Sequence, residues 1–115
     1  MSAPSPNETW IIEAGDDVIQ KKAREGFGNL TALEKLIYCV WVSDYGMRNA
    51  GDLDAAYDVY SDFQVEAAHL ANALSLNAIR DAFALRTDDL QRQYFERFDE
   101  ICDELKNARI TAGNA

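Results

Sequence analysis

The apolar segment that begins at Thr31 constrains the fold of this 115-residue chain more than any other part of the sequence. Thr31 and Glu34 have the spacing of a capping box, in which each side chain accepts a hydrogen bond from the other residue's backbone N–H. Apolar side chains then recur at helical intervals, at Leu33, Leu36, Ile37, Val40 and Trp41. Because Tyr38, Cys39 and Val42 widen this face, the sequence predicts a central helix that is buried on several sides.

A polar break follows this helix over residues 48–52. It contains Asn49 and Gly51, the two residue types that most readily take a positive φ, and then Asp52, a favourable N-cap. The break therefore predicts a turn between the central helix and a second helix that begins at Leu53, with Asp52 as the cap.

Helical signals also occupy most of the remaining chain. Further helices are expected over about residues 16–25, 53–60, 63–74, 77–85 and 87–109. The apolar triplet Trp10-Ile11-Ile12 fits either the start of a helix or an arm that packs across the core. No segment alternates with the period of a strand, so the sequence predicts an all-α fold, a single compact domain of five or six helices. We expect a disordered tail over residues 1–9, the helical domain over 10–109 and a flexible tail over 110–115.

The net charge of the chain limits the classes of molecule that it can bind. The net charge is −9, and 27% of the residues are charged. A surface of this sign repels nucleic acid and anionic lipid, and it attracts basic proteins or cations. The chain has no apolar run of membrane-spanning length and no secretory leader pattern, so we expect a cytoplasmic protein that does not bind membranes.

Metal and catalytic motifs are incomplete. Glu66 and His69 have the spacing that ferritin-like bundles use for metal, but such a site needs a second copy, and His69 is the only histidine. A zinc site from Cys39, Cys102 and His69 would lack a short Cys-x-x-Cys pair. Both cysteines are expected to be buried, reduced thiols. The chain also lacks a nucleophile motif and a phosphate-binding loop, so we predict no enzymatic activity, no metal and no cofactor.

Acidic side chains gather on one face of the last predicted helix, opposite Leu90, Tyr94 and Phe98. The candidate partner-binding residues are Asp89, Glu96, Asp99, Glu100 and Asp103. Helix neighbours three or four positions apart lie roughly 5–6 Å from one another, which resembles the pitch of a phosphate backbone. Arg92 and Arg97 interrupt the row. Two interpretations stay open: a solvated helix face, or a DNA mimic that presents carboxylates to the basic surface of a DNA-binding protein.

The arrangement over residues 30–105 resembles the bacterial DNA-mimic protein domain, a small all-helical family. The likeness lies in the capped helix over 31–41, the Asn-x-Gly turn within 45–52, the segment 57–63, a later Ala-Leu-rich segment and the aromatic-acidic run over 94–99. The family favours Asn-Gly-Gly before an aromatic residue, where this chain has Asn49-Ala50-Gly51-Asp52-Leu53, so it resembles a divergent member. The resemblance implies a homodimer that binds a transcription regulator through its acidic surface.

A second hypothesis is a small helical domain that binds a ligand or acts as an enzyme. Its pocket would lie near the break, with Asp44 and Arg48 as polar anchors. The aromatic lining would come from Trp41, Tyr45, Tyr57 and Tyr60. Aromatic core packing explains the same pattern. A third hypothesis, a purely structural dimer or complex subunit, cannot be separated from the interaction module by sequence.

Overall fold

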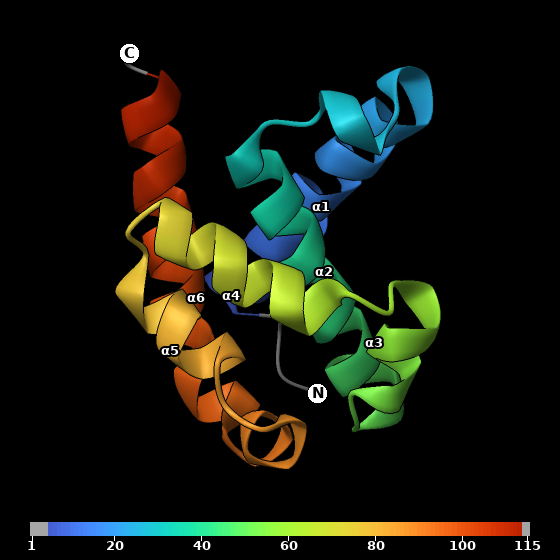
Figure 1. Ribbon diagram of the computed structural model, residues 1–115, viewed down its shortest axis with the longest axis vertical. Helices are drawn as coiled ribbons and strands as arrows, with labels where there is room; N and C mark the ends of the chain where they lie inside the picture. Colours follow the sequence, from blue (N-terminus) through green and yellow to red (C-terminus); the bar gives the residue numbers. More distant parts are fainter. Residues whose placement is uncertain (1–4, 114–115) are drawn as a thin grey trace.

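The computed structural model describes residues 5–113 and folds them into six α-helices and one short 3₁₀ helix (Figure 1). The elements are α1 (Pro6–Glu25), η1 (Phe27–Asn29), α2 (Ala32–Ala50), α3 (Asp54–Val59), α4 (Phe63–Ala73), α5 (Asn77–Phe83) and α6 (Thr87–Gly113). This part of the chain contains no strand, so the all-α prediction is confirmed.

Helix α2 is the centre of the molecule. It packs against α1, α3, α4 and α6 (Figure 1). The predicted capping box is present: the N–H of Thr31 donates to Glu34 Oε1 at 2.8 Å, and the N–H of Glu34 donates to Thr31 Oγ1 at 3.1 Å. The apolar face that follows is fully buried at Leu36, Val40 and Val42. The sequence therefore predicted both the start of this helix and its central position.

The break after α2 is shorter than predicted. Gly51 takes a φ of 76° and ends the helix, with its N–H donating to the carbonyl of Met47. The prediction of a positive φ at Asn49 is wrong, because Asn49 lies in the last turn of α2 and its side-chain amide donates to the carbonyl of Tyr45 at 2.8 Å. The N-cap of α3 is Leu53 rather than Asp52, although the Asp52 carboxylate accepts a hydrogen bond from the N–H of Asp54 at 3.1 Å.

Helix α1 is about twice as long as the predicted segment 16–25. It begins at Pro6, where Ser5 is the N-cap and its hydroxyl accepts a hydrogen bond from the N–H of Glu8. Ser before Pro at the first helical position is a strong start signal, and it outweighs the polar composition that suggested a tail. Residues 6–9 are therefore helical. The triplet at Trp10 lies within α1, with Ile11 fully buried.

The C-terminal helix is also longer than predicted. Helix α6 continues through Gly113, so residues 110–113, which were expected in a flexible tail, are helical. No glycine or proline interrupts the chain between Thr87 and Ala112, and nothing local stops the helix near Arg109. The expected tail positions 1–4 and 114–115 lie outside the described residues.

Two glycines allow helices to approach α2 closely. A Cβ atom at Gly15 of α1 would lie 2.2 Å from Trp41 Cδ1 and 2.9 Å from Trp41 Cβ. A Cβ atom at Gly46 of α2 would lie 2.9 Å from the backbone nitrogen of Ala56 in α3. Because real Cβ atoms do not approach other heavy atoms so closely, both crossings depend on glycine.

Candidate functional site

The exposed face of α6 carries a row of carboxylates, which we call the acidic stripe: Asp89, Glu96, Glu100 and Asp103. At about 100° of rotation per residue, these four positions fall within about 60° of one another around the helix axis. Glu96, Glu100 and Asp103 are exposed, and Asp89 is half-buried.

Asp99, the fifth predicted partner residue, does not belong to this row. It lies about 40° further round the helix than Asp103, on the side that faces α1. Its Oδ1 atom accepts a hydrogen bond of 2.8 Å from the side-chain amide of Asn7. The structure therefore brings four of the five predicted residues together and gives Asp99 a role in holding α1 to α6.

Packing of α6 explains why the acidic stripe faces solvent. The opposite face is buried at Leu90, Tyr94, Ile101 and Leu105, none of which has measurable exposure. Helices α1, α2 and α5 all contact α6, and none of the hydrogen bonds from these helices reaches the acidic stripe. The stripe thus lies along a side of α6 that the other helices of residues 5–113 leave open.

The acidic stripe is only partly neutralised. Asp89 forms an ion pair with Arg92, whose side chain is 71% exposed, so the pair is weak. Within residues 5–113, no hydrogen bond or ion pair engages the carboxylates of Glu96, Glu100 and Asp103. These three carboxylates are therefore available to an external cation.

A second polar group lies inside the fold, where α2 meets α6. The Asp44 carboxylate is 3% exposed and accepts a hydrogen bond of 2.7 Å from the hydroxyl of Tyr94. Arg48 Nε donates to both Asp44 oxygens, at 3.0 and 3.1 Å. The guanidinium of Arg48 also forms an ion pair of 3.1 Å with Glu8 of α1. This buried cluster joins three helices.

Burial shifts the pKa values of Asp44 and Tyr94 in this cluster. Burial raises the pKa of Asp44 above its ordinary value, and the hydrogen bond from Tyr94 and the charge of Arg48 oppose that rise. Burial and the neighbouring Asp44 raise the pKa of the Tyr94 hydroxyl well above its ordinary value. The Arg48 guanidinium lies over the rings of Phe95 and Phe98, at 5.1 and 4.7 Å from their centroids. The Arg48 guanidinium therefore contacts α1, α2 and α6, while 26% of its side chain stays exposed.

The pocket expected near the break does not form from the predicted residues. Trp41 stacks on Tyr45 with 5.6 Å between ring centroids, whereas Tyr57 packs against Phe63 at 4.7 Å in another part of the core. Of the cavities described for residues 5–113, a smaller one of about 310 Å³ includes Tyr57, and neither includes Arg48. The geometry thus favours aromatic packing over a ligand site at these positions.

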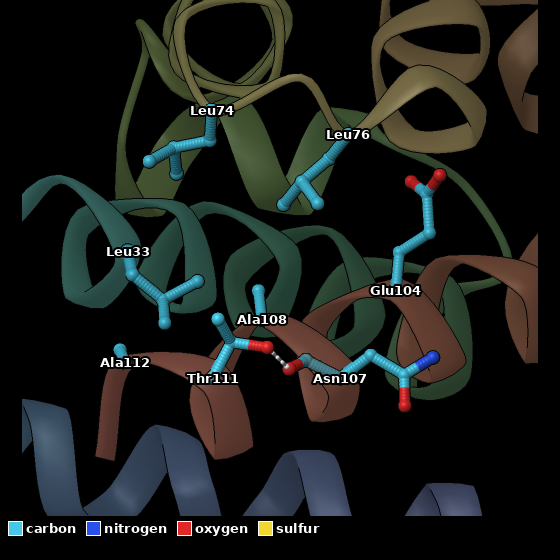
Figure 2. Close-up of a pocket in the computed structure, with 8 residues that line it drawn as sticks. All are labelled: Leu33, Leu74, Leu76, Glu104, Asn107, Ala108, Thr111 and Ala112. Carbon is cyan, nitrogen blue, oxygen red and sulfur yellow. Dashed lines mark hydrogen bonds between the residues drawn. The ribbon is translucent and has the colours of Figure 1, made fainter. Parts of the chain in front are cut away.

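The larger cavity is an apolar groove of about 540 Å³ that sequence reasoning missed. Figure 2 shows Leu33 of α2 and Leu74 and Leu76 of the α4–α5 connection projecting into the space beside α6. Its α6 wall consists of Glu104, Asn107, Ala108, Thr111 and Ala112. The available signal was the small-residue spacing of Ala108 and Ala112, but part of this wall lies beyond the predicted helix end at residue 109.

Glu104 fixes one end of the groove. Its two carboxylate oxygens accept hydrogen bonds of 2.9 Å from the N–H groups of Ala78 and Ile79, in the first turn of α5. A side chain of α6 therefore caps α5 from outside, since Leu76, the N-cap residue of α5, offers no side-chain hydrogen bond.

The cysteines are buried and free, as predicted. Burial raises the pKa of Cys102 to about 12 and also raises the pKa of Cys39. His69 is exposed on α4. Across the part of the chain that the structure describes, no group of three or more His, Cys, Asp or Glu side chains could hold a metal ion.

No helix between Ser5 and Gly113 combines the length and apolar character that a membrane crossing requires.

Comparison of the chain with known proteins found no matching protein-family model, no matching curated protein and no matching solved structure.

Proposed function

We propose that this protein is an interaction module that binds a basic protein through the acidic stripe of α6. The supporting observation is that Glu96, Glu100 and Asp103 share one exposed face and have no cationic partner within residues 5–113. On a chain with a net charge of −9, such a row attracts a cationic surface, and the attraction weakens as ionic strength rises.

The sharper form of this proposal is mimicry of DNA. Asp89 and Asp103 are separated by about 21 Å along the helix axis, and Glu96 and Glu100 by about 6 Å. A row of negative charges of this length fits the basic surface with which a DNA-binding protein, such as a transcription regulator, contacts phosphates. A homodimer, which the resemblance to the DNA-mimic family implies, would present the stripe twice.

Affinity capture from a bacterial lysate, with a salt titration and competition by duplex DNA, tests this function. The test variant is Glu96→Gln/Glu100→Gln/Asp103→Asn, which spares Asp99 because that residue binds Asn7. The matched control is Glu25→Gln/Asp58→Asn/Asp62→Asn, which changes the net charge equally at exposed positions outside α6.

The wild type and the control should recover a DNA-binding protein, identified by mass spectrometry, that high salt or duplex DNA releases. The stripe variant should lose it. Equal loss by both variants would show that net charge rather than the acidic stripe is responsible. Recovery of no DNA-binding protein at low salt would overturn the mimicry proposal.

A further inference from the structure

The apolar groove is continuous with the acidic stripe. On the α6 wheel, Asn107 lies about 20° from Glu100, and Thr111 lies about 20° from Glu100 on its other side. The α6 wall of the groove therefore begins at Glu104, directly after Asp103, and its members Asn107 and Thr111 continue the exposed side of the helix that carries the acidic stripe. A partner that lies along α6 would contact the acidic stripe and the groove together.

The groove exists because α5 is shorter than the face of α6 that it covers. Ala108 and Ala112 lie on the same side of α6 as the buried Leu90, Ile101 and Leu105. Helix α5 starts at Asn77, where Glu104 caps it, and the C-terminal end of α6 extends past it (Figure 1). The apolar face of α6 thus continues into the groove without a helix of the described chain over it.

Charge defines what fits this space. Among the residues of 5–113 that line the groove, Glu104 is the only charged one, and Glu100 and Asp103 lie beside it. The basic residues in this part of α6 point toward α1: Lys106 lies over the Trp10 ring at 5.8 Å, and Arg109 is 3.8 Å from Asp17. The surroundings of the groove therefore favour an apolar occupant that carries positive charge at its edge.

We infer that the groove receives the apolar face of an amphipathic helix from a basic partner protein, with Lys or Arg side chains of that helix against Glu100 and Asp103. This inference rests on the proposed function and specifies how the partner docks. A groove of about 540 Å³ accommodates apolar side chains. The small side chains of Ala108 and Ala112 allow the backbone of the incoming helix to approach, and such helices anchor through residues one turn apart.

A designed peptide tests the inference without knowledge of the natural partner. The probe is a fluorescein-labelled peptide of about 18 Leu and Lys residues, long enough to form a helix, with all Leu side chains on one face. A scrambled peptide of the same composition has the same charge but no apolar face. Fluorescence anisotropy should give the amphipathic peptide an affinity about tenfold higher than that of the scrambled peptide. Equal affinities would overturn the inference.

Two variants separate the groove from the acidic stripe. Ala112→Gln places a polar, uncharged side chain in the exposed part of the groove, and Ala108→Trp fills its floor. Each should lower the affinity of the amphipathic peptide about tenfold and leave the scrambled peptide unaffected. Glu100→Gln/Asp103→Asn should weaken both peptides. If only the charge variant weakens binding, the groove inference fails and the acidic-stripe function survives; if no variant weakens binding, both fail.

Chemical-shift mapping on the wild-type protein keeps the test independent of variant folding. The amphipathic peptide should shift the backbone resonances of Leu33, Leu76 and Thr111, whereas shifts confined to the acidic stripe would overturn the inference.

The same mapping with dodecylamine, a small cationic amphiphile, tests whether the groove binds a small molecule instead of a helix. If dodecylamine shifts the groove resonances and the peptide does not, the occupant is a small molecule and the proposed helix is wrong.

Discussion

The hydroxyl of Tyr94 donates a hydrogen bond of 2.7 Å to the carboxylate of Asp44, which lies 50 positions earlier in the chain. Tyr94 has no exposed surface, and Asp44 is 3% exposed. This contact, together with Arg48, satisfies a buried charge at the junction of α2 and α6. The hydrogen bond therefore stabilises the position of the helix that carries both the acidic stripe and one wall of the groove.

Removal of the Tyr94 hydroxyl should destabilise the fold. We expect Tyr94→Phe to lower the free energy of unfolding by about 1–3 kcal/mol, because the buried Asp44 carboxylate loses one hydrogen-bond donor. Urea denaturation measures the difference. Tyr45→Phe is the control, since Tyr45 is 43% exposed and its hydroxyl makes no hydrogen bond within residues 5–113. The control should change stability by less than about 0.5 kcal/mol. Equal effects would show that the contact with Asp44 contributes little.

Asp44 should also make stability depend on pH. Because burial raises its pKa in the folded state above the ordinary value of 3.8, the folded protein binds the proton more tightly than the unfolded chain does. The free energy of unfolding therefore rises as pH falls through the raised pKa toward 3.8. Asp44→Asn removes this titrating group. As the pH falls from the raised pKa toward 3.8, the free energy of unfolding of the wild type should therefore rise relative to that of the variant. Tyr94, Arg48, Glu8 and the Cys102 thiol are the titratable or charged groups around it.

Urea titrations of both proteins at several pH values measure the dependence. Other carboxylates titrate in the same range, but they are common to the two proteins and cancel in the difference. A stability difference that is constant with pH, or that moves in the opposite direction, would contradict the raised pKa of Asp44.

Gly15 should not tolerate a side chain. Gly15→Ala places a Cβ atom 2.2 Å from Trp41 Cδ1, so either the Trp41 side chain or α1 must shift. We expect a net loss of up to about 2 kcal/mol in the free energy of unfolding, because overpacking costs about 1–3 kcal/mol and alanine returns roughly 1 kcal/mol through helix propensity. Gly28→Ala is the matched control, because a Cβ atom at Gly28 would have nothing within 4 Å of it. Trp41→Ala removes the ring atom at 2.2 Å but keeps the Cβ atom at 2.9 Å. Partial rescue of Gly15→Ala by Trp41→Ala, measured by thermal unfolding, would therefore identify the contact with the Trp41 ring as the cause.

The sequence predicted the elements whose signals are local. The capping box at Thr31 and the apolar period after it were sufficient to place α2, and they also placed it at the centre of the core. The sequence signal for the start of α1, Ser5 followed by Pro6, was equally local, but the polar residues before Trp10 were interpreted as a tail. Local signals therefore predict most of the fold when caps are weighed above composition.

The candidate sites depend on contacts between distant segments. The separation of Asp99 from the acidic stripe requires Asn7, 92 positions away. The groove requires the α4–α5 connection, with Leu76, to lie beside the end of α6. From the sequence, Arg48 was expected to be a polar anchor of a ligand pocket. In the structure it contacts Glu8 and two phenylalanine rings. None of these pairings has a sequence interval that reveals it, since tertiary packing alone brings the partners together.

Burial should make both thiols unreactive in the folded protein. Cys39 and Cys102 have no exposed surface, and burial raises the pKa of Cys102 to about 12. Since the thiolate is the reacting form, labelling by Ellman's reagent at mildly alkaline pH should proceed only through unfolding. Urea should accelerate labelling in parallel with the loss of helical circular dichroism. Rapid labelling of one thiol without urea would reveal local opening of α2 or α6.

Glu104 should be required for the start of α5. Its carboxylate accepts hydrogen bonds from the N–H groups of Ala78 and Ile79, so Glu104→Ala leaves both donors without this partner. Loss of a helix cap costs about 0.5–2 kcal/mol, and here the charge near the helix N-terminus is lost as well. We expect a decrease of about 1–2 kcal/mol in the free energy of unfolding, together with faster amide hydrogen exchange at Ala78 and Ile79. Glu100→Ala is the control, because Glu100 is exposed on the same helix and caps nothing. If Glu104→Ala leaves exchange at these two amides unchanged, the cap is not what orders α5, and the boundary between α5 and the groove must depend on the apolar contacts of Leu76 and Ile79.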